Sequence, residues 1–390
     1  MAITDKETGV WSLDQVYNKI NQGSIWEYTG ANQLMATGYD DNGQIGLNSR
    51  GVAYSSPVQI PGTTWKYVSG SGTLNDSKNA FYIKTDGTMW GTGTNSKGQL
   101  GLNDRTNRSS PTQIPGTTWG PEVETLGQKS YAIKTDGTLW AWGYNNPSYG
   151  ELGHNNKTDY SSPVQIPGTT WSKVVSYGYG AMTTKTDGTL WTWGANNFGM
   201  LGLNNTTAYS SPKQVPGSTW GTSIGGGNQF GAAVKTDGTL WMWGVNEYGM
   251  LGQNDKTNYS SPRQVPGTTW SKVSGMQHNV IAVKTDGTAW SWGLNDGGQL
   301  GLNDLIYRSS PTQIPGTTWN NITTSQYNTL AVKTDGTLWG WGNNGQGQLG
   351  QNAVNNNGLS SPVQIPGTGW NTGDREFGTT WLGFRATKIL

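Results

Sequence analysis

Short runs of alternating apolar and polar residues, separated by glycine-rich turns, recur along almost the whole chain. In "AVKTDGTLWGW", Thr337, Trp339 and Trp341 fall on one side of an extended segment, and Leu338 and Gly340 fall on the other. The residues on either side of the Asp-Gly step are β-branched or aromatic, which is typical of strands. Asp-Gly between two such runs predicts a β-hairpin with a two-residue turn, in which both residues have positive φ.

This hairpin belongs to a repeating unit of about 50 residues. Near-identical copies of Lys-Thr-Asp-Gly-Thr-x-Trp begin at Lys84, Lys134, Lys185, Lys235, Lys284 and Lys333, and Thr29–Gly38 is a degenerate seventh copy. Three further motifs follow in each unit: Gly-x-Leu-Gly-x-Asn, Ser-Ser-Pro, and Gln-Ile/Val-Pro-Gly-x-x-Trp. The last motif ends at Trp65, Trp119, Trp171, Trp220, Trp270, Trp319 and Trp370. Segments such as "WSKVVSYG" predict one more strand, which gives about four short strands per unit.

Repeated four-stranded units predict an all-β fold, a seven-bladed β-propeller over residues 24–390. A small sheet cannot bury either of its faces alone, whereas radial packing buries both faces between neighbouring blades. The tryptophans at repeat positions are therefore interpreted as packing residues between blades. On this interpretation Trp191→Ala destabilises the fold by about 3–5 kcal/mol.

The motif "KTDGTLWAWGYNN…GELGHN" resembles the repeat of the regulator of chromosome condensation family. The resemblance covers about residues 25–385 and implies a seven-bladed propeller that is closed by pairing of the two chain ends. The family often carries Gly-x-x-His before the hairpin. In this chain only "GMQH" keeps the histidine, His278, whereas the equivalent positions hold Gln128, Tyr179 and Gln229. His278 is therefore interpreted as a packing residue and not as a catalyst.

Two segments compete for closure of the ring. The C-terminal stretch Phe377–Leu390 and the stretch Ser24–Tyr28 both align with the strand that precedes the other hairpins. Only one of them is needed to complete the blade that contains Leu34–Gly38, and the C-terminal segment is favoured.

Residues 1–23 form an arm outside the repeat. The apolar residues Leu13, Val16, Tyr17 and Ile20 fall on one face of a short predicted helix. A helix of about ten residues is not stable alone in water, so it is expected to dock on its own propeller, on a second subunit or on a larger assembly. These four residues, together with Trp11, are the candidate assembly contacts. The stretch Gly9–Gly23 also weakly resembles structural proteins of marine bacteriophages.

Composition narrows the range of partners. The chain has 59 Gly, 21 Trp and 17 Tyr, which can build a core from few but bulky residues. Its net charge is +1, with no run of Lys or Arg, so nucleic acid is not an expected partner. No apolar stretch reaches the roughly 18 residues of a membrane helix, and no signal peptide is visible at the N-terminus, so membrane insertion is not expected.

The sequence contains few residues of the types that catalyse reactions. The chain has two histidines and no cysteine, too few groups for a nucleophile–base triad, so no enzyme activity, cofactor or metal is expected. The glycine-rich stretch Gly225–Gly231 lacks the signature of a phosphate-binding loop and is interpreted as a turn. Exposed tyrosines before Ser-Ser-Pro are candidate sugar contacts, namely Tyr160, Tyr209 and Tyr259.

Three functions fit these features. The first is a non-enzymatic component of a bacteriophage virion, a tail appendage or capsid decoration that contacts other virion proteins and a host surface protein or glycan. The second is a cytoplasmic regulator that promotes nucleotide exchange on a small GTPase, as the family resemblance implies. The third is a lectin that binds through loop Tyr or Trp side chains. The virion component is the function that the sequence favours.

Overall fold

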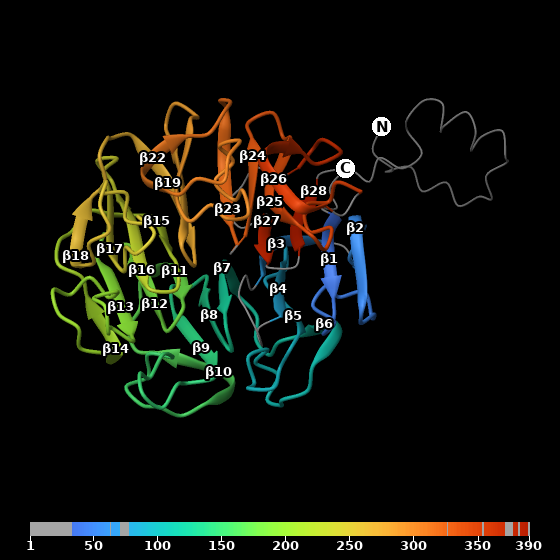
Figure 1. The fold of residues 1–390 in the computed structure, drawn as a ribbon. Coiled ribbons are helices and arrows are strands. Elements are labelled where there is room, and N and C mark those ends of the chain that lie inside the picture. Colours follow the sequence, from blue (N-terminus) through green and yellow to red (C-terminus); the bar gives the residue numbers. More distant parts are fainter. Residues whose placement is uncertain are drawn as a thin grey trace, which may run out of the picture.

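The computed structural model describes residues 33–62, 64–70, 78–325, 327–352, 355–370, 377–380 and 383–388. The secondary structure of these residues consists of strands and turns, with no helix, and hence no helix that could cross a membrane. The strands form seven four-stranded antiparallel sheets arranged around a central axis (Figure 1). The all-β propeller of four-stranded blades that the sequence predicts is confirmed. The predicted N-terminal helix and its candidate contacts lie outside the described residues.

Each of the first six blades consists of four consecutive strands. Blade 1 comprises β3 (Trp65–Gly70), β4 (Asn79–Lys84), β5 (Met89–Gly93) and β6 (Arg108–Gln113). Blade 2 comprises β7 (Trp119–Leu126), β8 (Lys129–Lys134), β9 (Leu139–Gly143) and β10 (Tyr160–Ile166). Blade 3 comprises β11 (Trp171–Tyr177), β12 (Gly180–Lys185), β13 (Leu190–Gly194) and β14 (Tyr209–Gln214).

The second half of the ring repeats this arrangement. Blade 4 comprises β15 (Trp220–Gly226), β16 (Phe230–Lys235), β17 (Leu240–Gly244) and β18 (Tyr259–Gln264). Blade 5 comprises β19 (Trp270–Met276), β20 (Asn279–Lys284), β21 (Ala289–Gly293) and β22 (Arg308–Gln313). Blade 6 comprises β23 (Trp319–Thr324), β24 (Asn328–Lys333), β25 (Leu338–Asn344) and β26 (Asn355–Gln364).

The last blade joins the two ends of the chain. Its strands are β1 (Gln33–Asp40), β2 (Val52–Gln59), β27 (Phe377–Thr380) and β28 (Gly383–Lys388), in the spatial order β2-β1-β28-β27. In the register of this sheet, Leu34 pairs with Thr387 and Ala36 pairs with Arg385. The prediction that the C-terminal segment closes the ring is therefore confirmed, and Ser24–Tyr28 lies outside the described residues.

The order of strands within a blade gives the propeller two different faces. The innermost strands are β3, β7, β11, β15, β19, β23 and β27, because these contact one another in turn around the axis. Counted outward from the axis, they are the first strands of their blades. Since all neighbours are antiparallel, the turns between first and second strands lie on the same face as the long loops between third and fourth strands. We call this face the loop face. The Lys-Thr-Asp-Gly-Thr hairpins lie on the opposite face, which we call the hairpin face.

The hairpin turn differs from the predicted one. In blade 2 the N–H of Gly137 donates to the carbonyl of Lys134 at 2.9 Å, and only Gly137, with φ 77°, has positive φ in the turn. This is a three-residue loop, a tight turn followed by a left-handed glycine, so the prediction of a two-residue turn was wrong. The Asp136 carboxylate explains the preference. It accepts hydrogen bonds from the backbone N–H and the hydroxyl of Thr138, at 2.9 and 2.7 Å, which fixes the loop without requiring positive φ at the aspartate.

A stacked lysine accompanies each of these hairpins. In blade 2 the Lys134 ammonium lies 5.0 Å from the ring centroid of Trp119 and 4.4 Å from that of Trp140. The Trp140 indole N–H donates to the hydroxyl of Thr138 at 2.9 Å. The same lysine contacts recur at Lys84, Lys185, Lys235, Lys284 and Lys333. The lysine of the repeated decapeptide thus has a local structural role, because a cation over the faces of two indoles is attracted by the rings.

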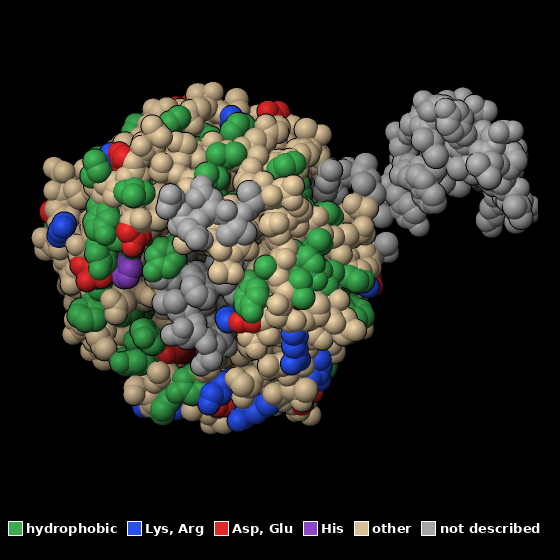
Figure 2. Space-filling model, turned by 45° about the vertical axis from the view of Figure 1, so that its right-hand side comes forward, with side chains coloured by type: hydrophobic (Ala, Val, Ile, Leu, Met, Phe, Trp, Pro, Cys, Tyr) green, Lys and Arg blue, Asp and Glu red, His purple; other side chains and the backbone are tan. Residues whose placement is uncertain are grey.

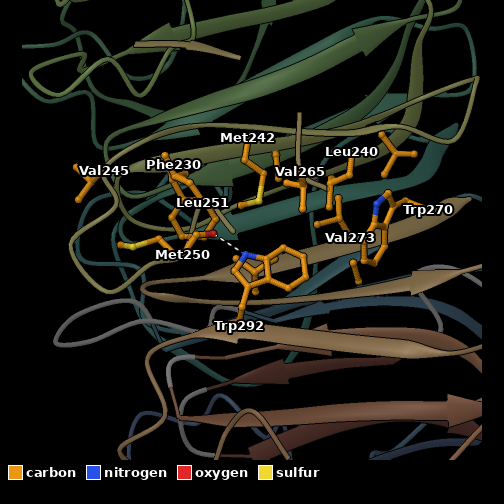
Figure 3. Packing of buried hydrophobic residues seen from close by; sticks show 14 residues of the cluster. Phe230, Leu240, Met242, Val245, Met250, Leu251, Val265, Trp270, Val273 and Trp292 are labelled. Atoms are coloured by element: carbon orange, nitrogen blue, oxygen red, sulfur yellow. Dashed lines mark hydrogen bonds between the residues drawn. The ribbon is translucent and has the colours of Figure 1, made fainter. Parts of the chain in front are cut away.

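The hydrophobic core consists of seven separate clusters, one between each pair of neighbouring blades. Figure 3 shows the cluster between blades 4 and 5, where Trp292 from β21 lies against side chains of blade 4. The indole N–H of Trp292 donates to the carbonyl of Met250 in the neighbouring blade at 2.8 Å. The cluster between blades 6 and 7 includes Phe384 of the closing strand β28. The predicted packing of indoles between blades is confirmed.

The hairpins of blades 2 to 6 each carry two tryptophans, and these two differ in burial. Trp193, the second tryptophan of β13, is fully buried and donates its indole N–H to the carbonyl of Glu151 in blade 2 at 2.7 Å. Trp191 is only partly buried and donates to the hydroxyl of Thr189 within its own blade. Trp191, the tryptophan that the sequence analysis chose, therefore packs at the edge of the core cluster between blades 2 and 3 and not within it. Both side chains project from the same side of the sheet, but only Trp193 lies deep between blades.

Candidate interaction surface

The loop face carries most of the exposed large apolar side chains. Among the described residues, six large hydrophobic side chains are exposed, and five of them lie in loop-face turns. These five are Tyr179, Phe198, Leu305, Ile306 and Tyr307. Figure 2 shows hydrophobic side chains in several places on one face of the molecule, some of them beside acidic groups and a histidine. This distribution makes the loop face the candidate interaction surface, because grouped apolar exposure marks contact sites.

The aromatic side chains of this face meet at junctions between blades. The rings of Tyr149 in blade 2 and Tyr179 in blade 3 have centroids 6.1 Å apart. At the next junction but one, the Tyr248 ring of blade 4 lies 4.9 Å from the His278 ring and 5.8 Å from the Tyr307 ring, both of blade 5. Tyr149 and Tyr248 occupy the same repeat position, immediately before a Gly-x-Leu-Gly motif. In both cases the ring that packs against the tyrosine belongs to the following blade. Sequence alone gave no signal for these contacts, since the paired residues belong to different repeat units.

His278 lies inside the second of these aromatic groups. Its Nδ1 is 3.7 Å from the Oε1 of Glu247, and its ring is packed against Tyr248. Burial lowers the pKa of His278, and the negative charges of Glu247 and Asp296 oppose this shift. The interpretation of His278 as a packing residue is consistent with this position, although the residue also belongs to the candidate surface.

The other histidine packs on the outer side of blade 2. The Nε2 of His154 lies 3.0 Å from the carbonyl oxygen of Val164, and its ring lies 5.2 Å from the ring of Tyr160. Burial lowers the pKa of His154, and the hydrogen bond to Val164 opposes the shift. Neither histidine lies beside a serine or threonine in the described contacts, so a nucleophile–base pair is not assembled there.

Both depressed histidine pKa values predict that the fold is less stable in acid. The unfolded chain takes up protons near pH 6.5, the ordinary value for histidine, whereas the folded chain resists protonation. The contribution of these two histidines to the free energy of unfolding is therefore fully present above pH 6.5. It is lost as the pH is lowered through their pKa values in the folded chain. We expect the urea midpoint to be lower at pH 5.5 than at pH 7.5. His154→Gln/His278→Gln, which installs residues found in equivalent units, should reduce that difference, and an unchanged difference would contradict the assignment.

The three predicted sugar-contact tyrosines lie at the starts of outermost strands in three different blades. The Tyr160 hydroxyl accepts a hydrogen bond from the Asn156 amide at 3.0 Å. Lys213 lies over the ring of Tyr209 at 5.3 Å, and Arg263 lies over the ring of Tyr259 at 4.8 Å. All three rings are half-buried and pack against core clusters. The structure does not bring them together in one site, and sugar binding by them stays a prediction.

A polar cavity lies at the ring axis, among the innermost strands. The innermost strands line a volume of about 310 Å³ with serine and threonine hydroxyls and with Lys173 and Lys272. The Lys173 ammonium is 3.2 Å from a carboxylate oxygen of Glu122 on the neighbouring strand. Gly225 and Gly226 lie in strand β15 and line this cavity, so the glycine-rich stretch is partly strand as well as turn. Among the described residues, no group of three or more acidic or histidine side chains is placed to hold a metal.

Comparison with known proteins identifies the repeat. The family described as "Regulator of chromosome condensation (RCC1) repeat" matches residues 86–119, 136–184, 187–234, 237–282, 286–332 and 335–371. A second description of the same repeat matches residues 320–348. The chain belongs to the regulator of chromosome condensation (RCC1) repeat family. The resemblance seen in the sequence is thereby confirmed for the RCC1 repeat, while the likeness of Gly9–Gly23 to bacteriophage proteins has no counterpart in these matches.

The chain is also similar to a curated protein and to solved structures. The human E3 ubiquitin-protein ligase HERC2 is 26% identical over 176 residues, which are 44% of this chain and 4% of that protein. The chain therefore spans only a small part of this curated relative. The crystal structure of human WBSCR16 has a TM-score of 0.79 at 18% identity and covers 92% of this chain and 99% of that chain. The crystal structure of Prp20p from Saccharomyces cerevisiae has a TM-score of 0.78 at 17% identity and covers 92% of each chain. At these identities the structural likeness shows the fold alone.

Proposed function

We propose that this RCC1-repeat propeller is a non-enzymatic binding protein that holds a protein partner on its loop face. The observation that carries the proposal is that five of the six exposed large apolar side chains of the described residues lie in loop-face turns. A rigid ring with seven inter-blade cores keeps such loops in fixed positions, so little conformational entropy is lost when a partner binds.

We further propose that the partner belongs to a bacteriophage virion, in which the chain is a tail appendage or capsid decoration. The near-identical repeat units and the apolar helix face that the sequence predicts at Leu13, Val16, Tyr17 and Ile20 support this setting. The arm would attach the propeller to the particle, and the loop face would remain free for a second protein, such as one on the host surface.

Mass spectrometry of purified particles tests this setting directly. We expect the chain to co-purify with virions through a density gradient, and a variant that lacks residues 1–23 to be lost from the particles. The isolated propeller should keep its thermal transition, which separates loss of attachment from loss of folding. Absence of the intact chain from purified particles would refute the virion proposal while leaving a binding role open.

A regulator of a small GTPase is the second candidate. It is favoured by membership of the RCC1 family and by the similar fold of Prp20p, a protein whose structure was described with its binding to Gsp1p and histones. The test is release of a fluorescent GDP analogue from a set of small GTPases. On the virion proposal we expect no acceleration of release. Acceleration that is lost in a loop-face variant would favour the regulator instead.

A further inference from the structure

One loop of blade 5 differs from an otherwise identical loop elsewhere in the same chain. Residues 98–119 and residues 298–319 match at every position except three consecutive ones. Blade 1 has Arg-Thr-Asn at 105–107, whereas blade 5 has Leu-Ile-Tyr at 305–307. Two polar residues and one cation have thus been replaced by three large apolar side chains in a loop on the loop face.

Equivalent hydrogen bonds stabilise the two loops. In blade 1 the Asp104 carboxylate accepts from the backbone N–H of Thr106 at 2.9 Å and from the guanidinium of Arg108 at 2.5 Å. Asp304 makes the equivalent bonds in blade 5, at 2.9 and 2.6 Å. The substitution at the loop tip therefore does not follow from a different loop conformation.

The apolar tip does not serve the folding of its own loop. Leu305, Ile306 and Tyr307 are 55%, 62% and 43% exposed, so their apolar surface remains largely in water. In blade 1 the Asn107 side chain also accepts a hydrogen bond from the backbone N–H of Asn95 at 2.8 Å. At the equivalent position in blade 5, the ring of Tyr307 packs against Tyr248 instead. A tip that gives up a local bond and exposes apolar surface indicates a contact with another molecule.

The surroundings of this tip are aromatic and acidic. Tyr307 packs edge-on against Tyr248, and Tyr248 packs against His278. Glu247 is exposed beside His278, with its side chain 54% accessible, and the exposed Asp296 acts on both His278 and Tyr307 through its charge. Among the described residues, neither carboxylate forms an ion pair with a lysine or arginine. The negative charges of Glu247 and Asp296 are therefore available to a partner.

We propose that Leu305, Ile306 and Tyr307, with Tyr248, Glu247 and Asp296, form a docking site for a protein segment that has an apolar anchor flanked by lysine or arginine. We call this set of residues the blade 5 patch. The proposal rests on the proposed binding function and deepens it by naming the site and the chemistry of the partner. The apolar anchor packs on the loop tip, and a flanking cation lies between the tyrosine rings and the two carboxylates.

Two physical effects act together in this site. Apolar and aromatic side chains near the centre of an interface contribute most of the affinity when they are removed from water. A cation gains from the faces of the tyrosine rings and from the charges of Glu247 and Asp296. Because the carboxylates are exposed, their contribution is screened by salt, whereas the apolar contribution is not.

A peptide-display selection with an internal loop swap tests the proposal. Random dodecapeptides displayed on a carrier are selected on the immobilised full chain and counter-selected on Leu305→Arg/Ile306→Thr/Tyr307→Asn. This variant gives blade 5 the loop tip of blade 1, where the same hydrogen bonds hold the loop. We therefore expect it to fold with an unchanged thermal midpoint. Peptides that bind only the unchanged chain should contain Leu, Ile, Phe or Trp together with several Lys or Arg.

The affinities of synthetic peptides from that selection separate the possible outcomes. We expect the loop swap to weaken binding by about tenfold or more. Glu247→Gln/Asp296→Asn should weaken binding of the same peptide at low salt and reduce its dependence on salt. A charge-reversed peptide, with Glu in place of each Lys or Arg, should bind weakly to all three proteins.

A reciprocal swap distinguishes a specific site from non-specific binding by the apolar loop tip alone. Arg105→Leu/Thr106→Ile/Asn107→Tyr, introduced into the swapped chain, places the same apolar tip in blade 1 without Tyr248 and Glu247 beside it. We expect this chain not to regain the affinity for the basic peptides, and full recovery would overturn the proposal.

Three further results would also overturn it. These are failure to enrich any peptide that the loop swap excludes, enrichment of acidic peptides, and binding on a glycan array that the loop swap abolishes while no peptide binds. Peptides or proteins that bind the unchanged and swapped chains equally would refute the blade 5 patch but leave the proposed binding function intact. Failure of both chains to bind any protein would refute both.

Discussion

Replacing Trp193 by alanine is expected to lower the free energy of unfolding by about 3–5 kcal/mol, the largest effect of any single tryptophan in its hairpin. The indole is fully buried between blades 2 and 3, and its ring lies 6.0 Å from that of Tyr131. Its N–H donates to the carbonyl of Glu151. Alanine would leave a cavity that two rigid sheets cannot close and would leave this carbonyl without that donor.

Trp191→Ala provides the matched comparison. Trp191 is two residues away on the same side of β13, but it is partly exposed and bonds only within its own blade. We expect its replacement to cost clearly less than the replacement of Trp193. Urea unfolding followed by circular dichroism gives both values, since tryptophan fluorescence would change with the substitution itself. Equal losses for the two variants would contradict the assignment of Trp193 to the inter-blade core.

Removing the charge from either Lys129 or Glu151 is expected to destabilise the fold by about 3–5 kcal/mol, because each would leave a buried charge without its partner. The Lys129 ammonium lies 2.9 Å from a carboxylate oxygen of Glu151, and the two side chains are only 3% and 5% exposed. The ammonium also donates to the carbonyl of Gly178 in blade 3 at 2.8 Å. This pair lies beside Tyr131 and Tyr177, whose pKa values are raised by burial and, to a smaller extent, by the charge of Glu151.

The chain itself supplies the control for this ion pair. Blade 5 has Asn279 and Gln299 at the positions equivalent to Lys129 and Glu151, and blades 1 and 6 have the same uncharged combination. Lys129→Asn/Glu151→Gln should therefore be much more stable than either single variant. Chemical unfolding of the four proteins in a double-mutant cycle measures the coupling. If the double variant were as unstable as the sum of the single variants, the two charges would not depend on each other.

The comparison with Trp191 shows where sequence reasoning reached its limit within a blade. The alternation of Trp339 and Trp341 on one side of a strand was readable from the sequence, because side chains alternate along any extended segment. Which of two such residues lies deeper depends on how closely the neighbouring blade approaches. The hairpin turn failed for a related reason: Asp-Gly fits two turn types, and the bonds from Thr138 to Asp136 select the three-residue loop.

The candidate surface was almost invisible in the sequence. Tyr160, Tyr209 and Tyr259 were chosen because they recur at one repeat position, and this regularity reflects a shared packing role at the rim. The residues that gather on the loop face, such as Tyr248, His278 and Tyr307, occupy three different repeat positions in two blades. Only the ring brings them together, because it places a loop of one blade beside a turn of the next.

The sequence by itself determined the kind of unit, its repetition and the class of fold, since the period of the repeat and the alternation within each strand are local properties of the chain. It also favoured the C-terminal strand for closure. The tertiary structure decided which residues lie between blades, how Lys129 and Glu151 are buried together, and which loops form a common surface. These features depend on contacts between units far apart in the sequence, and a repeat pattern does not contain the distances that such contacts require.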